Sequence, residues 1–399
     1  MGGGRMSISG TWQRLALGAA LMLALPMAQA LQVTISAQYR GGASGHFENT
    51  TPPALFCQRW PKQCPEFGVV DLPITFVKEV FGGTQNTRDE YFVQLPSRRE
   101  VDIYHEQTGE PHRVQLEISG VSQAVGGPAP SLNPVYTSPR GGCTIEAAHS
   151  QGSGTVRYLW NVNTPIAPAP CHSIINDGDA SYHQVVNTDE MGIVYRLSMP
   201  PPYRMAPGMY RGSVTYTIGP GGDFDFGNHV SQLNGSTLTL DFVLDVQHLF
   251  LFSFPPGSDR AVLEPAGGWL AWLGGGRAPQ RIYRDMPFRL WSTGPFKAYK
   301  KCQYEVDIRC GIRNGNGDEV PVQVALSLPG GIQYQGQAAE RVPLPTGRAQ
   351  ALAFESAGPT LNRPGQLHFV VPKDQVPLML AHPGSTYTGQ VTVVFDAEL

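Results

Sequence analysis

The residues of this sequence that could act in catalysis do not complete any familiar motif. His105-Glu106 begins a zinc-protease pattern, but Gly109 stands where the second histidine would be needed. Gly152-Ser153-Gly154 lacks the spacing of a nucleophile elbow, and there is no P-loop or dinucleotide fingerprint. We therefore predict a protein that is not an enzyme and has no cofactor. Paired carboxylates in an all-β fold cannot be placed from sequence, so a secreted carbohydrate-active enzyme stays open as an alternative.

Metal sites are not predicted either. Asn176-Asp177-Gly178-Asp179 begins like a calcium loop, but Tyr182 occupies the position that needs glycine and Thr188 the position that needs glutamate. The segment 223–228, rich in aspartate, is better explained as a turn than as a cation loop. The ten histidines form no cluster in the sequence.

Six cysteines offer a different chemistry, that of disulfide bonds. Fifteen connectivities are possible for six cysteines. Pairing in sequential order is the simplest, because each pair then lies within one local stretch, and the absence of any C-x-x-C pattern argues against zinc. The predicted disulfides are Cys57–Cys64, Cys143–Cys171 and Cys302–Cys310.

The N-terminal segment predicts export, which suits disulfides. Arg5 and Arg14 form a basic region, residues 15–27 are apolar, and Ala28-Gln29-Ala30 is a small-x-small cleavage pattern. We expect residues 1–30 to be a signal peptide, with a permanent anchor helix as the alternative. The net charge of −3 and the absence of basic runs predict no nucleic-acid partner.

The composition predicts β-strands as the elements that position the residues discussed above. Charged residues make up 15% of the chain, against about 25% in an ordinary domain, whereas glycine, proline and β-branched residues are frequent. The run 237–246 alternates, with Leu238, Leu240, Phe242, Leu244 and Val246 on one face. Strands are expected at residues 33–39, 74–80, 91–95, 113–118, 155–160, 192–197, 213–218, 237–246, 288–291, 304–309, 320–328, 366–371 and 388–395. Short, regularly spaced strands predict an all-β protein built from immunoglobulin-like β-sandwiches.

An internal similarity divides the chain in two. Tyr210-x-Gly212-x-Val214-Thr215 is echoed by Tyr387-x-Gly389-x-Val391-Thr392, 177 residues later. Such a repeat predicts two related domains, each using the motif near its last strands, although chance similarity in a Gly/Tyr/Val-rich chain is an alternative. We expect an N-terminal domain over residues 31–247 and a C-terminal domain over residues 248–399.

Several stretches resemble tip subunits of chaperone–usher fimbriae. The final stretch, 384–399, resembles the last strand of fimbrial subunits. The stretches 46–64, 219–228 and 244–248 resemble large two-domain fimbrial-like tip subunits. Cys302 and Cys310 depart from the pattern, since the usual pilin disulfide spans tens of residues. A tight bulge or hairpin is needed to join them.

The resemblance implies a fold, a set of partners and a location. The C-terminal domain would be an incomplete pilin sandwich, completed by a donor strand from a periplasmic pilus chaperone and then from the next pilin subunit, with assembly at an outer-membrane usher. The N-terminal domain would sit at the fimbrial tip on the cell surface and mediate adhesion to a host glycan or other receptor. A minor tip or initiator subunit that nucleates assembly without binding a receptor stays open as an alternative.

The resemblance also implies site residues. Val391, Val393 and Phe395 share one face of the last strand and would line the edge of the donor-strand groove, with the Leu399 carboxylate held by the chaperone. Thr392 and Val394 would lie on the opposite face. For a receptor sugar, the candidates are Trp160 with Asn161 and Asn163, and Trp60 in the Cys57–Cys64 loop; packing in the core or in a loop is the alternative for each.

Overall fold

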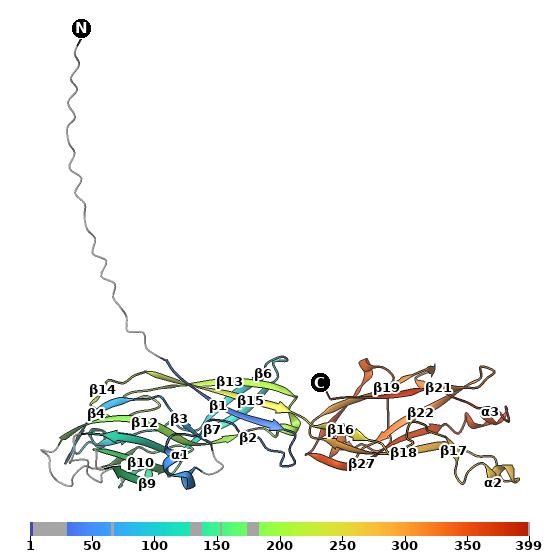
Figure 1. The fold of residues 1–399 in the computed structure, drawn as a ribbon, viewed down its shortest axis with the longest axis horizontal. Coiled ribbons are helices and arrows are strands. Elements are labelled where there is room, and N and C mark those ends of the chain that lie inside the picture. Colours follow the sequence, from blue (N-terminus) through green and yellow to red (C-terminus); the bar gives the residue numbers. More distant parts are fainter. Residues whose placement is uncertain (3–29, 65–67, 128–137, 152–153, 174–182, 398–399) are drawn as a thin grey trace.

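The computed structural model describes residues 1–2, 30–64, 68–127, 138–151, 154–173 and 183–397. The predicted signal peptide lies almost wholly outside these residues, as does Leu399. The described residues are mostly β, and their strands form four sheets. Two sheets are built from residues 30–247 and two from residues 250–396, and the two parts lie end to end (Figure 1). No helix in the described ranges is long and apolar enough to cross a membrane.

The described residues of the N-terminal part form fifteen strands. Their bounds are β1 (Ala30–Arg40), β2 (Glu48–Asn49), β3 (Gly68–Asp71), β4 (Phe76–Phe81), β5 (Tyr91–Val93), β6 (Arg99–His105), β7 (Pro111–Gly126), β8 (Arg140–Gly141), β9 (Cys143–Gln151), β10 (Thr155–Val162), β11 (Cys171–Ser173), β12 (His183–Ser198), β13 (Gly208–Thr217), β14 (Val230–Ser231) and β15 (Thr237–Gln247). The short helices are α1 (Phe56–Arg59), η1 (Pro61–Gln63), η2 (Thr87–Asp89) and η4 (Pro202–Arg204).

The larger N-terminal sheet has the order β14-β4-β12-β7-β6-β13-β15-β1-β2, and β10 joins it through β7. The strand β15 lies between β13, to which it is antiparallel, and β1, to which it is parallel. Its alternating pattern explains this central place. The five apolar side chains predicted to share a face are all 0% exposed, whereas the residues between them are partly exposed.

Residues 250–397, as the structure describes them, form thirteen strands. Their bounds are β16 (Phe250–Ser253), β17 (Glu264–Pro265), β18 (Ile282–Ser292), β19 (Phe296–Cys302), β20 (Tyr304–Val306), β21 (Arg309–Arg313), β22 (Glu319–Ser327), β23 (Ile332–Tyr334), β24 (Gln337–Ala338), β25 (Val342–Pro343), β26 (Leu352–Ser356), β27 (Thr360–Val371) and β28 (Val391–Asp396). The short helices are α2 (Leu270–Leu273), α3 (Val376–Leu380) and η5 (Arg348–Gln350).

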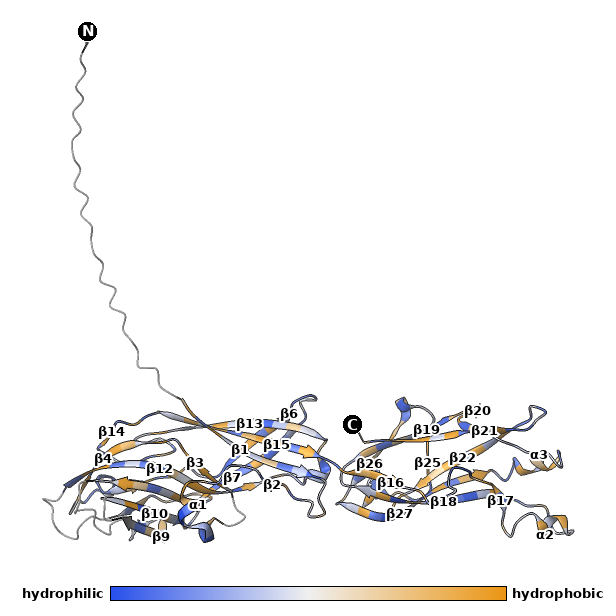
Figure 2. Ribbon diagram, viewed as in Figure 1, coloured by the Kyte–Doolittle hydropathy of each residue, from blue (hydrophilic) through white to orange (hydrophobic). Residues whose placement is uncertain are grey.

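Two C-terminal sheets enclose a separate core. One has the order β16-β18-β27-β22-β21-β20 and the other β24-β23-β26-β19-β28. Their apolar faces meet in a cluster centred on Phe288, Leu290, Phe296, Leu326 and Phe354. Figure 2 shows apolar and polar residues alternating along these strands, as the sequence pattern predicts.

The predicted strand at residues 304–309 is wrong in one respect. The chain reverses after Val306, so that β20 and β21 form a tight hairpin with Val306 opposite Arg309. Asp307, at the turn, has a φ of 55°, which a continuous strand would not allow. This hairpin is the link that the short Cys302–Cys310 spacing requires.

All three sequential cysteine pairs are joined in the structure. Cys57–Cys64 closes the segment that carries α1 and η1. Cys143–Cys171 ties β9 of the large sheet to β11 of the small one. Cys302–Cys310 joins the end of β19 to β21.

The junction between the two parts is short, because only two residues separate β15 from β16. His248 Nε2 donates to the Met205 carbonyl oxygen at 2.8 Å, and its ring meets that of Tyr39 edge-on. The backbone N–H of Leu249 donates to Thr293 Oγ1 at 2.8 Å. These contacts tie the linking residues to both sides.

Candidate functional site

The strand β28 is paired along one edge only. It is antiparallel to β19, with Val393 opposite Lys300. Among the described residues no strand lies along its other edge. In the facing sheet, β16 likewise pairs only with β18. Each of these edges leaves backbone N–H and C=O groups available to a further strand.

Aromatic side chains fill the space between these two edges. The ring of Phe395 on β28 lies 5.1 Å from that of Phe252 and 6.1 Å from that of Phe250, both on β16. It also contacts Phe288 and Phe296 of the core. Phe252 is 38% exposed. Partly exposed phenylalanines therefore form the boundary of this core, between two strands that each have one unpaired edge. They offer apolar surface to an added strand.

The proposed groove residues lie as the alternation predicts. Val391, Val393 and Phe395 pack, partly buried, against the C-terminal core, and Thr392 is exposed. Val394 is partly buried rather than open. The Leu399 carboxylate lies outside the described residues.

The repeated motif shows what is missing beside β28. In the N-terminal part, Arg211 pairs with Tyr104 on β6. In the C-terminal part, Thr388 pairs with Arg313 at the end of β21. The glycine of each motif lies close to the backbone of the neighbouring strand. A Cβ on Gly212 would lie 2.4 Å from a backbone oxygen of β6, and one on Gly389 would lie 2.6 Å from a backbone oxygen of β21. The motifs therefore occupy equivalent places, but only β13 is covered by a strand like β15.

The candidate receptor residues separate into two groups. Trp160 is 0% exposed and stacked on Tyr158 in the core, so its assignment as a sugar-stacking residue is wrong. It lies on the inner face of β10, where the side chains support the sheet. Asn161 and Asn163 point to solvent, and Asn161 Nδ2 donates to Glu146 Oε2 at 2.6 Å. Only Trp60 borders the pocket described next.

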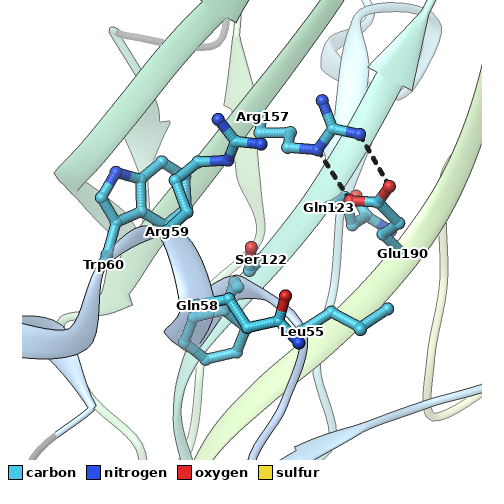
Figure 3. A pocket seen from close by; sticks show the side chains of 9 residues that line it. Leu55, Gln58, Arg59, Trp60, Ser122, Gln123, Arg157 and Glu190 are labelled. Atoms are coloured by element: carbon cyan, nitrogen blue, oxygen red, sulfur yellow. Dashed lines mark hydrogen bonds and ion pairs between the residues drawn. The ribbon is translucent and has the colours of Figure 1, made fainter.

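This pocket of about 400 Å³ lies beside the disulfide-closed segment (Figure 3). Its walls come from α1 with its flanking residues, from β7, β10 and β12. The lining residues are Leu55, Phe56, Gln58, Arg59, Trp60, Ser122, Gln123, Arg157 and Glu190. A second pocket on the other side of the same segment includes Lys62, Gln63 and Asn161.

Three contacts fix the segment that carries Arg59 and Trp60. Phe56 is 7% exposed and fits against Gly192, where a Cβ would lie 2.8 Å from its ring. Both carboxylate oxygens of Asp71 accept the Leu55 backbone N–H, at 3.0 and 3.1 Å. The Cys57–Cys64 disulfide closes the loop. This wall of the pocket is therefore anchored to the sheet.

The opposite wall depends on a β-bulge. The register between β12 and β7 shifts between Asp189 and Gly192, and Glu190 within the bulge has a φ of 47°. This conformation directs its carboxylate to Arg157, which donates through Nε and Nη2 at 2.7 Å each. Those bonds hold the pKa of Glu190 below its ordinary value, so it stays ionised.

The residues that build this pocket escaped the sequence analysis, Trp60 excepted. Arg157 and Glu190 are 33 residues apart, and they meet because β10 and β12 both pair with β7. Only the Glu190-x-Gly192 sequence, which interrupts a strand pattern, hinted at a bulge. Among the described residues, no group of three or more His, Cys, Asp or Glu side chains is arranged to hold a metal.

One further chain of polar groups crosses the C-terminal sheet. Ser327 Oγ lies 2.8 Å from His368 Nε2, and His368 Nδ1 lies 2.7 Å from Asp285 Oδ1. This is the order of groups in serine hydrolases. However, the Ser327 hydroxyl also accepts the Arg341 backbone N–H at 2.9 Å, and His368 is 2% exposed. The hydroxyl therefore already has a donor and an acceptor as partners.

No protein-family model matches the chain, and no curated protein sequence matches it. Among the solved structures that match it are three that align over most of its length. The chain resembles chaperone–usher tip adhesins. A chaperone–tip adhesin complex of CFA/I fimbriae is 12% identical with a TM-score of 0.24, over 80% of this chain and 83% of that one. The CfaE adhesin of enterotoxigenic E. coli is 9% identical with a TM-score of 0.26, over 92% of each chain.

The third structure is a CsuC–CsuE chaperone–tip subunit pre-assembly complex from Acinetobacter baumannii. It is 9% identical with a TM-score of 0.21, over 92% of this chain and 99% of that one. At such low identities and TM-scores, the case for a function rests on the geometry of the present chain.

Proposed function

We propose that this chain is a tip subunit of a chaperone–usher pilus. Residues 248–399 form a pilin domain that accepts a strand, and residues 31–247 form a domain that mediates adhesion. The observation that carries the proposal is the open edge of β28. The equivalent edge of β13 is covered by β15, while β28 has no such neighbour among the described residues.

The strand β15 indicates what the incoming strand must look like. It runs antiparallel to β13, and five alternate apolar side chains enter the N-terminal core. A strand that completes the C-terminal core should run antiparallel to β28 and place alternate apolar side chains against Phe252 and Phe395. Main-chain hydrogen bonds would supply affinity, and the side chains specificity.

The proposed partners follow from this chemistry. A periplasmic chaperone would cover the open edges first, the next pilin subunit would then replace it, and an outer-membrane usher would assemble the fibre. The linker consists of only two residues, His248 and Leu249, and both are held by hydrogen bonds. The C-terminal domain therefore has no free preceding segment to donate. This favours a place at the end of a fibre. The three disulfides suit an exported protein.

Expression of the two parts separately tests the proposal. A fragment of residues 31–247 should be soluble and unfold cooperatively, because β15 completes its sheet. A fragment of residues 248–399 should aggregate or remain bound to a chaperone. A soluble, monomeric and cooperatively folded C-terminal fragment, with no added strand, would rule out an incomplete sandwich.

A further inference from the structure

We propose that the pocket beside the Cys57–Cys64 segment binds the carboxylate of an acidic saccharide. The proposal rests on the adhesive role given above to residues 31–247. It places the ligand on the side of the N-terminal part, against the sheet face covered by α1, rather than at Trp160 (Figure 3).

The charged residues that line the pocket are two arginines and one glutamate, which leaves one positive charge in excess. Arg157 and Glu190 form a two-bond ion pair, so their charges offset each other. Arg59 is exposed and has no hydrogen bond or ion pair with any described residue, and its charge only helps to lower the pKa of Glu190. Asp71 and Asp189 also lie close to Glu190, but neither lines the pocket, and the Asp71 carboxylate faces the Leu55 backbone N–H. The planar guanidinium of Arg59 suits a carboxylate, which it can bind through two parallel hydrogen bonds.

The floor of the pocket supplies a second, independent observation. Ser122 is only 2% exposed, and it lines the pocket. Figure 3 shows this side chain in the middle of the ring formed by Gln58, Arg59 and Arg157. A serine hydroxyl can both donate and accept a hydrogen bond, so at this position it can contact a polar group of a ligand.

The remaining walls fit a sugar ring. Trp60 and Leu55 provide apolar surface on which the C–H face of a pyranose can rest, and Gln58 adds an amide. The volume of about 400 Å³ lies in the range of small-ligand sites. Phe56, Asp71 and the disulfide hold this wall in place before binding, so little conformational entropy is lost on binding.

Titration calorimetry on the full chain with matched sugars tests the proposal. We expect 3′-sialyllactose to bind and lactose, which lacks the carboxylate, to bind at least tenfold more weakly. Glucuronate and glucose form a second matched pair, which distinguishes a uronic acid from a sialic acid as the source of the carboxylate. Preference for the charged member of either pair supports the proposal.

Variants locate the site. Arg59→Ala should weaken binding of the acidic sugar roughly tenfold or more, Arg59→Lys should weaken it less, and Ser122→Ala should weaken it several-fold. Arg277→Ala, an exposed arginine in the C-terminal part, is the control for loss of one positive charge and should bind as the wild type does. The thermal midpoint of each variant shows whether the fold is intact.

Three outcomes would overturn the proposal: equal binding of charged and neutral sugars, unchanged binding by Arg59→Ala, or no binding of any of the four sugars. Each is separable from a failure of the proposed tip role. If the wild-type protein binds no acidic sugar, or if Arg59→Ala binds it as the wild type does, while the chain still reaches assembled fibres, the pocket assignment fails and the place in the fibre stands.

Discussion

Val214 pairs in register with Leu240 of β15, whereas Val391, at the matching position of the second Tyr-x-Gly-x-Val-Thr motif, has no partner on that side among the described residues. Val214 and Val391 are both partly exposed, but Val214 is flanked by Leu240, which is 0% exposed, whereas no described strand continues the sheet beside Val391. One motif therefore occurs in a completed sheet and again in a sheet with an open edge. This difference makes the proposed strand acceptor testable by single substitutions.

A charge on the inner face of β28 should abolish capture by a chaperone. Val393→Asp would place a carboxylate against the apolar cluster around Phe395, where burial of an unpaired charge is strongly unfavourable. Thr392→Asp, on the exposed side, is the matched control. Co-purification from the periplasm and counts of surface fibres should show loss for Val393→Asp and retention for Thr392→Asp. Wild-type behaviour of both would show that β28 is not the acceptor edge.

Removal of the Cys143–Cys171 disulfide should destabilise the N-terminal part. It closes 28 residues and joins two sheets, so the double substitution to Ala should lower the free energy of unfolding by about 3 kcal/mol. Peptide mapping of the non-reduced protein should also recover this pair. A Cys64–Cys143 peptide would contradict the connectivity.

Lys78 should make a pH-dependent contribution to stability. It is 0% exposed, and its ammonium donates to three backbone carbonyls, those of Arg88, Phe226 and Asn228. Burial lowers the pKa of Lys78 from 10.5 to about 8. Lys78→Met leaves these carbonyls unpaired and should cost roughly 2–3 kcal/mol at pH 7.

The sign of the pH effect follows from proton binding. Between about pH 8 and 10.5 the unfolded chain holds the Lys78 proton and the folded chain does not. The unfolding free energy of the wild type should therefore rise across that window relative to Lys78→Met. Urea unfolding of both proteins at pH 7 and pH 9.5 measures the difference between their unfolding free energies. An unfolding free energy of the wild type that falls relative to that of Lys78→Met between pH 7 and pH 9.5 would contradict the burial of a charged Lys78.

The Ser327–His368–Asp285 chain should be structural rather than catalytic. Because the Ser327 hydroxyl is bonded at both its donor and acceptor positions, a fluorophosphonate probe should not label it. Labelling of the wild type that is lost in Ser327→Ala would instead favour a hydrolase. Activity on polysaccharide lost in the same variant would support the enzyme alternative.

Much of the architecture was accessible from the sequence because it is local. Alternation predicted β15 and the inner face of β28, and sequential pairing predicted the bonded cysteines. The reversal at Asp307 was missed because the flanking residues read as one β-rich run. Trp160 was misplaced because the sequence alone does not say which face of β10 is buried.

The pocket depends on relationships that no local pattern contains. Arg157 meets Glu190 through strand register and a bulge, and Ser122 reaches the floor because β7 lies between β10 and β12. Such contacts depend on which strands pair across long stretches of sequence. The alternation of apolar and polar residues does not predict that pairing.

The most direct test of the central claim is to supply the missing strand within the chain. A copy of residues 237–247, joined after Leu399 by a short Gly/Ser linker, can fold back antiparallel to β28. The control carries the same copy with aspartate at the positions of Leu240 and Phe242. Of the two extended chains, only the one with the apolar copy should have a higher thermal midpoint than the wild type. The same chain should no longer co-purify with the chaperone. Identical midpoints and identical chaperone binding for the wild type and both extended chains would contradict an incomplete C-terminal sandwich.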